Sequence, residues 1–227
     1  MHLLLSVKDR DSIFKVLEHY AVIKESGEHL KSILVVDLHD DQVLREFCQS
    51  NAVGYEPFYR EEFNKSVALN LGINRLYAEY PSEQVLVCDA DVTLDHHLLS
   101  DIAQCEAPII LDEVQESEDG SVRKAFGMIK CFLKGLVEVG GYDSEFNGWG
   151  FEDHDIIWRL ENIGYKFKRL GRGTHISHSD EKRVRHYYSD NLSGMRLKNK
   201  GYYESKVKNK ILSGTLNSDI ALTSHER

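Results

Sequence analysis

The chain has 227 residues, of which 41% are hydrophobic and 29% are charged, so it is long enough and apolar enough to fold around one sizeable core. Its formal net charge of -9 argues against a nucleic-acid partner, because binding to a phosphate backbone depends on clustered lysine and arginine. Four widely spaced cysteines form no CxxC pair, and no run approaches the ~20 apolar residues of a membrane span, so we expect a cytoplasmic protein with buried thiols.

The first half of the chain alternates between strand and helix patterns. Short apolar runs bounded by polar residues predict buried strands, and apolar residues three or four apart predict helices. The predicted strands lie at 3–7, 33–37 and 85–88, and the predicted helices lie at 13–20, 43–48 and 63–80, the last ended by Pro81. Strands separated by helices indicate an α/β fold with a mainly parallel central sheet flanked by helices, in which ligands bind beyond the carboxyl ends of the strands.

The second half of the chain has a less regular pattern. Its predicted strands lie at 109–111, 126–129 and 165–170, with a helix at 153–163. An acidic segment at 112–121 predicts a surface loop or hairpin, and His175 and His178 fall in a predicted loop after the last strand. The residues after Lys210 are polar, so we expect a tail that frays.

The acidic triplet Asp89-Ala90-Asp91 follows directly on a predicted buried strand. Two carboxylates on one short turn are hard oxygen ligands suited to Mg²⁺ or Mn²⁺, and such a cation can neutralise a diphosphate leaving group. The alternative is that Asp91 or Asp95 caps the following helix.

A second motif runs from Asn147 to Asp155. Its glycines allow the backbone to bend, and Trp149 offers a flat apolar face on which a sugar ring can stack. Glu152 and Asp153 follow at a helix start, where a carboxylate can accept a proton from an attacking hydroxyl. The alternative is that these acids complement the helix dipole and that Trp149 is a core residue.

His175 and His178 lie three residues apart and can complete a metal site of carboxylate and imidazole ligands. The alternative is an ordinary surface or core role for each. The pair His96-His97 falls in a predicted helix, where we expect it to face solvent or core.

These motifs, with the segment Phe63–Gly72, occur in the order seen in β-1,4-galactosyltransferases. Over residues 1–200 the chain resembles a GT-A glycosyltransferase close to that family, with an N-terminal half similar to bacterial family 2 enzymes. The resemblance implies one Rossmann-like GT-A domain at 1–210 and a polar tail at 211–227. Within the domain it implies a nucleotide-sugar-binding half at 1–105 and an acceptor-binding half at 106–210.

The resemblance also implies roles for single residues. Asp153 would be the catalytic base. The metal would be held by Asp91, His175 and His178. The nucleotide and phosphates of the donor would be held by Asp9, Arg10, Phe63, Lys65, Asp89, Ala90 and Asp91. The acceptor site would be formed by Trp149, Gly150, Glu152 and Asp153.

Three departures from the family pattern bear on specificity. The animal galactosyltransferases have methionine where His175 stands, so the site here should be harder and less dependent on manganese. They have an acidic residue where His154 stands and a bulky aromatic residue near Ala125, which affects the sugars that fit.

The resulting hypothesis is an inverting, metal-dependent transfer from a UDP-sugar to a hydroxyl of a glycan or lipid-linked acceptor, with UDP-galactose or UDP-N-acetylgalactosamine as the favoured donors. The alternatives are a retaining or glucuronosyl-type transferase of polysaccharide synthesis, and a non-catalytic module that binds nucleotide-sugars or glycans. The basic segments 166–172 and 183–210 are either solvated faces or a contact with the inner face of an anionic membrane or with a phosphorylated carrier.

Overall fold

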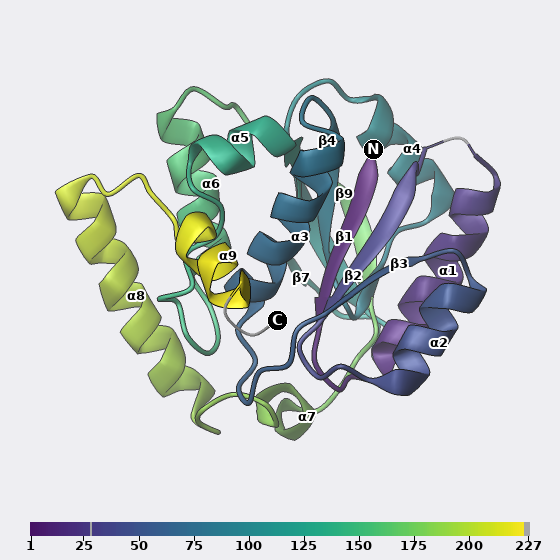
Figure 1. Ribbon diagram of the computed structural model, residues 1–227, viewed down its shortest axis with the longest axis horizontal. Helices are drawn as coiled ribbons and strands as arrows, with labels where there is room; N and C mark the ends of the chain where they lie inside the picture. The colour runs from purple at the N-terminus through teal and green to yellow at the C-terminus, as the bar shows by residue number, and fades with distance from the viewer. Residues whose placement is uncertain (28, 225–227) are drawn as a thin grey trace.

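The computed structural model describes residues 1–27 and 29–224, and its centre is a nine-stranded sheet in the order β3-β2-β1-β4-β8-β6-β9-β5, with β7 paired to β6 (Figure 1). The strands are β1 (His2–Val7), β2 (Ser32–Asp37), β3 (Gly54–Pro57), β4 (Gln84–Asp89), β5 (Val92–Thr93), β6 (Ile109–Glu116), β7 (Val122–Lys124), β8 (Ile129–Phe132) and β9 (Lys168–His175). Among these, β5, β7 and β8 run against the other six. The predicted α/β fold with a mainly parallel sheet is therefore confirmed.

Helices cover both faces of the sheet. The helices are α1 (Ser12–Glu25), α2 (Gln42–Ser50), α3 (Lys65–Glu79), α4 (His96–Gln104), α5 (Leu133–Glu138), α6 (Glu152–Asn162), α7 (Asp180–Val184), α8 (Leu192–Asn209) and α9 (Leu216–Ser224). The core on one face includes side chains of α1, α2 and α4, and the core on the other includes side chains of α3, α5, α6 and α9. In Figure 1, α1 and α2 lie to the right of the sheet, and α5, α6 and α9 lie to its left.

Strand β1 shows why the central strands read as continuous apolar runs. Leu3 and Leu5 join the core on the α1 side, while Leu4 between them joins the core on the α3 side. Because successive side chains point to opposite faces, a strand covered on both faces needs apolar residues at every position. This arrangement leaves the carboxyl ends of the strands as the place for polar chemistry.

Two predicted strands begin later than expected. The strand predicted at 126–129 is β8, which starts at Ile129, and the strand predicted at 165–170 is β9, which runs from Lys168 to His175. Strand β6 extends to Glu116 and pairs with β9 along that length, which places His175 opposite Glu116. The prediction that His175 lies in a loop is therefore wrong, because pairing with β6 continues the strand up to it.

The segment predicted to fray is ordered over the described residues. Helix α9 packs against α3, and its Leu216 and Asp219 are buried. The side-chain amide of Asn70 in α3 donates to Asp219 Oδ2 at 2.7 Å. The prediction of a fraying tail is wrong for 211–224, because buried hydrogen bonds help to hold this largely polar helix against the domain. Residues 225–227 lie outside the described residues.

Buried ion pairs attach helix α8 to the rest of the domain. Lys206 Nζ lies 3.1 Å from Asp155 Oδ1 in α6, and Asp155 in turn pairs with Arg159 at 2.7 Å. Lys206 also donates to Asp143. All four side chains are almost fully buried, so each charge depends on its partners.

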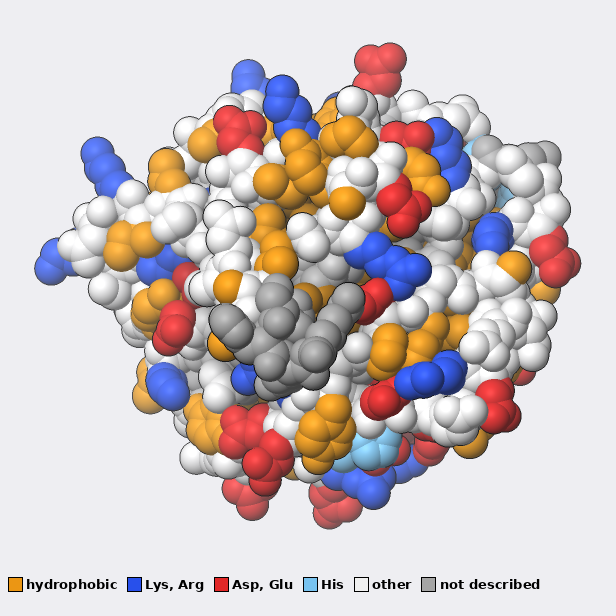
Figure 2. All heavy atoms as spheres, viewed as in Figure 1, with side chains coloured by type: hydrophobic (Ala, Val, Ile, Leu, Met, Phe, Trp, Pro, Cys, Tyr) orange, Lys and Arg blue, Asp and Glu red, His pale blue; other side chains and the backbone are white. Residues whose placement is uncertain are grey.

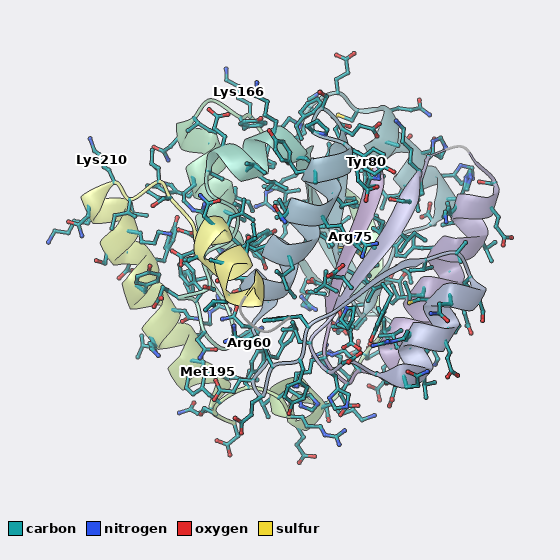
Figure 3. All side chains as sticks on the ribbon, viewed as in Figure 1. Arg60, Arg75, Tyr80, Lys166, Met195 and Lys210 are labelled. Atoms are coloured by element: carbon teal, nitrogen blue, oxygen red, sulfur yellow. The ribbon has the colours of Figure 1, made fainter. Side chains whose placement is uncertain are left out.

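The opposite side of α8 is exposed and basic. Lysine side chains project from its C-terminal end, near Lys210, on the face that Figures 2 and 3 show. Among the described residues, no helix has both the length and the apolar character needed to cross a bilayer.

Candidate active site

A pocket of about 450 Å³ lies beyond the carboxyl ends of β1 and β4, where the fold predicts a ligand site. Asp89 is the last residue of β4, and Arg10 follows β1 by a short loop. Eleven of the predicted site residues line the pocket: Arg10, Phe63, Lys65, Asp89, Ala90, Asp91, Trp149, Gly150, Glu152, Asp153 and His175. The structure thus brings the donor and acceptor motifs into one cavity.

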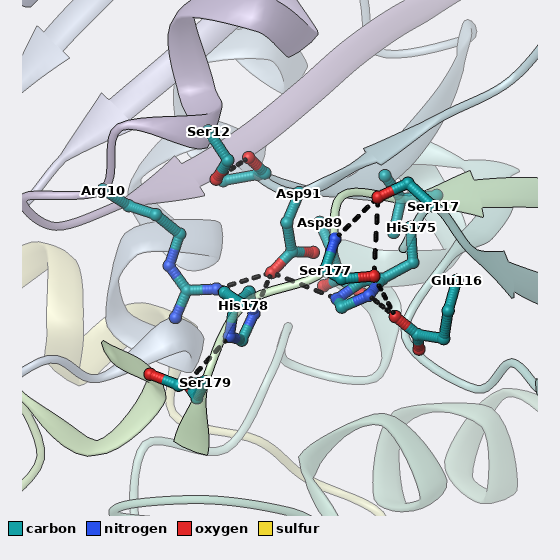
Figure 4. A network of polar contacts seen from close by, with 12 residues as sticks. Arg10, Ser12, Asp89, Asp91, Glu116, Ser117, His175, Ser177, His178 and Ser179 are labelled. Carbon is teal, nitrogen blue, oxygen red and sulfur yellow. Dashed lines mark hydrogen bonds and ion pairs between the residues drawn. The ribbon is translucent and has the colours of Figure 1, made fainter. Parts of the chain in front are cut away.

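The predicted metal ligands form a cluster at one side of this pocket. Candidate ligand atoms of Asp91, His175 and His178 all lie within 4.8 Å of one another. Asp91 Oδ2 is 3.1 Å from His178 Nε2 and 3.7 Å from His175 Nε2, as Figure 4 shows. The pairing of β5 with β9 places Val92 opposite His175 and so brings the two motifs together.

Glu116 sets the orientation of His175, and the sequence reasoning missed it. His175 Nδ1 lies 2.5 Å from Glu116 Oε2, which leaves Nε2 directed toward Asp91 (Figure 4). Ser177 Oγ donates to the same Glu116 oxygen at 3.0 Å. A carboxylate behind a histidine ligand is the arrangement that fixes the imidazole in metal sites. Glu116 lies in the acidic segment 112–121, for which the sequence predicted only a surface loop or hairpin.

The electrostatics of the cluster keep Asp91 in its anionic form. Burial by itself raises the pKa of Asp91, but hydrogen bonds from His175 and His178 and the nearby charge of Arg10 hold it below its usual value. Burial lowers the pKa of His175, and Asp91 and Glu116 more than reverse this, so the net shift is upward. Anionic oxygen beside two imidazoles is a donor set that fits a divalent metal ion.

Lys65 pairs with Asp89, so the two acids of the triplet have different partners. Its Nζ lies 2.9 Å from Asp89 Oδ1 and 3.1 Å from Asp153 Oδ2, so it bridges the end of β4 and the start of α6. Burial lowers the pKa of Lys65, but the charges of Asp153 and Asp89 raise it overall, which keeps the amine protonated. Among the described residues, Asp91 belongs to the metal cluster, whereas Asp89 belongs to this bridge.

Asp153 is a buried carboxylate in the first turn of α6. The helix begins after Phe151, whose φ of 75° is left-handed, and Gly148 and Gly150 also have positive φ. Burial raises the pKa of Asp153 to about 8, the charge of Glu152 adds to the rise, and Lys65 opposes it. A pKa near neutrality suits a group that must take up a proton at physiological pH.

Gly127 allows two carboxylates to approach each other. A Cβ atom at this position would lie 2.6 Å from Asp89 Oδ2 and 3.2 Å from Asp153 Oδ2. A side chain at position 127 would therefore push the Asp89 carboxylate out of its observed position.

The side of the pocket that the sequence predicts to bind the acceptor carries a group of rings that we call the aromatic shelf: Trp149, Phe151, Phe126 and His154. Phe126 stacks on His154 with ring centroids 4.7 Å apart, and Phe151 lies 5.1 Å from His154. Burial lowers the pKa of His154, so it is a neutral ring at pH 7. The sequence assigned Trp149 to the acceptor site and linked His154 to the choice of sugar, but it did not indicate Phe126, which comes from a distant strand connection.

Some predicted residues take other positions. Asp9 is not on the pocket wall; its carboxylate pairs with His186 at 3.1 Å. Asp95 caps α4 by accepting a hydrogen bond from the Leu98 amide, so the cap alternative holds for Asp95 and not for Asp91. The pair His96-His97 lies exposed at the start of α4.

Comparisons with known proteins place this geometry in context. A family model described as the N-terminal domain of galactosyltransferase matches residues 119–186, which contain the Trp149 block and both histidines. No curated protein sequence matches the chain.

Solved structures share the fold at low sequence identity. The Drosophila β1,4-galactosyltransferase 7 mutant with manganese, UDP-Gal and xylobiose is 14% identical, with 86% of this chain and 80% of that chain covered at a TM-score of 0.57. A mannosyltransferase from Pyrobaculum calidifontis is 12% identical, with 99% and 74% covered at 0.56. A 4-diphosphocytidyl-2C-methyl-D-erythritol synthase is 14% identical, with 82% and 96% covered at 0.53.

The chain therefore has the predicted GT-A fold, which it shares with these transferases, and its residues 119–186 are similar to a galactosyltransferase domain. The family that it resembles is that of the galactosyltransferases, as the sequence motifs predicted.

Proposed function

We propose that this protein is an inverting, metal-dependent transferase that moves a hexose or N-acetylhexosamine from a UDP-sugar to a hydroxyl of a glycan or lipid-linked acceptor. The observation that carries the proposal is one pocket lined both by Asp91 and His175 of the metal cluster and by the buried carboxylate of Asp153, with the third cluster member, His178, beside Asp91 and off the pocket wall. The complex of the Drosophila enzyme with manganese, UDP-Gal and xylobiose supports this choice of metal, donor and acceptor class.

The residues of this chain divide the chemistry between them. Asp153 takes the proton of the acceptor hydroxyl while the hydroxyl oxygen forms a bond to the anomeric carbon of the donor sugar. The bond from that carbon to the UDP oxygen breaks at the same time. Lys65 holds Asp153 beside Asp89 and keeps the carboxylate directed into the pocket. A divalent ion held by Asp91, His175 and His178 would stabilise the negative charge of the departing UDP.

The favoured donors remain UDP-galactose and UDP-N-acetylgalactosamine. Ala125 supports a roomy donor site, because this small residue lines the pocket next to Phe126. A glucuronosyl donor is the alternative that a donor screen separates from these two.

The test is UDP release from a panel of UDP-sugars with Mg²⁺ or Mn²⁺, with and without saccharide acceptors. We expect acceptor-dependent release that Asp153→Asn lowers by about 10²- to 10⁴-fold while UDP still binds. Product anomers analysed by NMR distinguish inversion from retention. Because a related fold also occurs in a synthase of another class, pyrophosphate release from nucleoside triphosphates is measured in parallel, and such release without UDP-sugar turnover would refute the proposal.

Peripheral contact with the inner membrane face stays a prediction. Deleting the chain from Arg183 onward is no clean test, because α8 contributes Lys206 to the buried charges. Charge reversal at exposed lysines of α8 leaves that core intact, and flotation with anionic liposomes then measures binding. The variants to combine are Lys198→Glu, Lys200→Glu and Lys208→Glu. Unchanged flotation would dismiss the contact.

A further inference from the structure

Arg196 of α8 lies on the pocket wall against the aromatic shelf. Its guanidinium carbon is 5.3 Å from the ring centroid of Trp149 and 5.5 Å from that of Phe151. Among the described residues no carboxylate pairs with it. Four other basic residues of the wall already contact carboxylates: Arg10, Lys65, Arg123 and Lys124. Arg196 is thus a positive charge available to a ligand.

The stacked position determines what Arg196 can bind. A guanidinium that covers ring faces keeps its N–H edge for hydrogen bonds, and that edge matches the paired oxygens of a carboxylate or phosphate. At the other end of the shelf Arg169 lies over Phe126, with 5.2 Å between the guanidinium carbon and the ring centroid. Arg169 pairs with Asp112 at 3.9 Å and does not line the pocket, so Arg196 is the cation that an anionic group on a stacked sugar ring would meet.

The charge of the whole wall agrees with this reading. Seven lysines and arginines line the pocket against four aspartates and glutamates, whereas the chain as a whole has 28 basic and 37 acidic residues. Part of this excess faces the metal cluster, where Arg10 contacts Asp91. Arg196 instead contacts Trp149 and Phe151, on the side where Asp153 awaits the acceptor hydroxyl.

We propose that Arg196 and the aromatic shelf bind an acceptor saccharide that carries a negative charge, either a carboxylate or a phosphate ester, on the sugar unit stacked there. The proposal rests on the proposed function, because it assigns this side of the pocket to the acceptor. It adds a substrate class: anionic acceptors are preferred over neutral acceptors of the same shape.

The test uses three matched probes: methyl β-D-glucoside, methyl β-D-glucuronide and the 6-phosphate of the glucoside. Their dissociation constants are measured by calorimetry on the full chain in the presence of UDP and Mn²⁺. A hydrogen-bonded contact with a charged group corresponds to about tenfold to hundredfold in affinity, so at least one charged probe should bind that much more tightly than the neutral probe. The preferred probe tells carboxylate recognition from phosphate recognition.

Arg196→Gln should remove the preference for charge and leave the affinity for UDP unchanged. Arg196→Lys should keep part of the preference, because it retains the charge but loses the planar fork. Lys200→Gln, which removes an exposed charge from the same helix, is the matched control and should change nothing. Thermal unfolding of each variant checks that the fold is intact.

The proposal is overturned when charged and neutral probes bind wild type alike or not at all, or when Arg196→Gln weakens UDP binding, which would make Arg196 a donor residue. UDP-sugar turnover is scored separately. A preference for charged probes without any turnover would refute the proposed function and support the anionic binding site. Turnover without that preference would support the proposed function and refute the anionic binding site.

Discussion

Replacing Asp153 by asparagine should inactivate the protein and also stabilise it. The carboxylate is buried beside Glu152 and Asp89, and Lys65 compensates it. A group whose pKa is about 8 in the folded chain and about 4 in the unfolded chain stabilises the fold only while it is protonated. As pH rises from about 4 to about 8 the folded state therefore loses stability relative to the unfolded state.

The size of this effect follows from the pKa difference. Each pH unit between the two values costs about 1.4 kcal/mol, so by pH 7 the folded state has lost up to about 4 kcal/mol of stability relative to pH 4. Asparagine has nearly the same shape and carries no charge, so Asp153→Asn escapes this cost while its amide oxygen can still accept a hydrogen bond from Lys65. The difference in unfolding free energy between variant and wild type should thus grow from pH 4 to pH 8.

The assay is urea unfolding of wild type and Asp153→Asn at pH 5, 6, 7 and 8, with chelator present so that no metal alters the charges. Asp101→Asn removes an exposed carboxylate and should show no such trend. A variant that is less stable than wild type at pH 7, or a difference that does not change with pH, would refute the account of Asp153 as a destabilised buried acid. Turnover of wild type should rise with pH over the same range.

Three further predictions concern the residues around the pocket. Glu116→Gln should weaken Mn²⁺ binding by about 10- to 100-fold in a calorimetric titration, because His175 loses the carboxylate that orients its ring. Unchanged affinity for Mn²⁺ would contradict this. Gly127→Ala should lower turnover at least about tenfold, because the new Cβ lies 2.6 Å from Asp89 Oδ2. The control Gly201→Ala should leave turnover unchanged, because its Cβ meets no atom within 4 Å. Lys206→Met should cost about 3–5 kcal/mol of unfolding free energy in urea, and an equal loss in the exposed control Lys200→Met would count against a buried network.

The sequence was sufficient for the parts of the fold that follow from periodicity. Strands β1, β2 and β4 are buried on both faces, so their apolar runs are unambiguous, and Asp89 at the end of β4 could be placed on the ligand side of the sheet. The short elements β3, β5 and α5 have too few residues to show a period. Helix α9 escaped notice because its buried positions include Asp219, which its hydrogen bonds stabilise in the core.

The site could be predicted where one motif holds all the relevant atoms. Asp153 and the two histidines lie in recognisable blocks, and the structure brings them together. Lys65 was assigned to the donor, but its contact with Asp153 joins residues separated by 88 positions, which no local pattern reveals. Arg196 likewise reaches Trp149 only because α8 folds back along α6, a packing that buried charges rather than apolar spacing determine.

The hydrogen bond between Asn70 and Asp219 joins residues 149 positions apart, and this separation bears on how the chain folds during synthesis. Helix α3 is made early, yet the polar interior that it shares with α9 stays incomplete until the segment around Leu216 has emerged. Long-range contacts of this kind form late, because closing so large a loop costs entropy before any contact repays it. Since α3 also carries Lys65 at its first position, the pocket should gain its final order among the last events of folding.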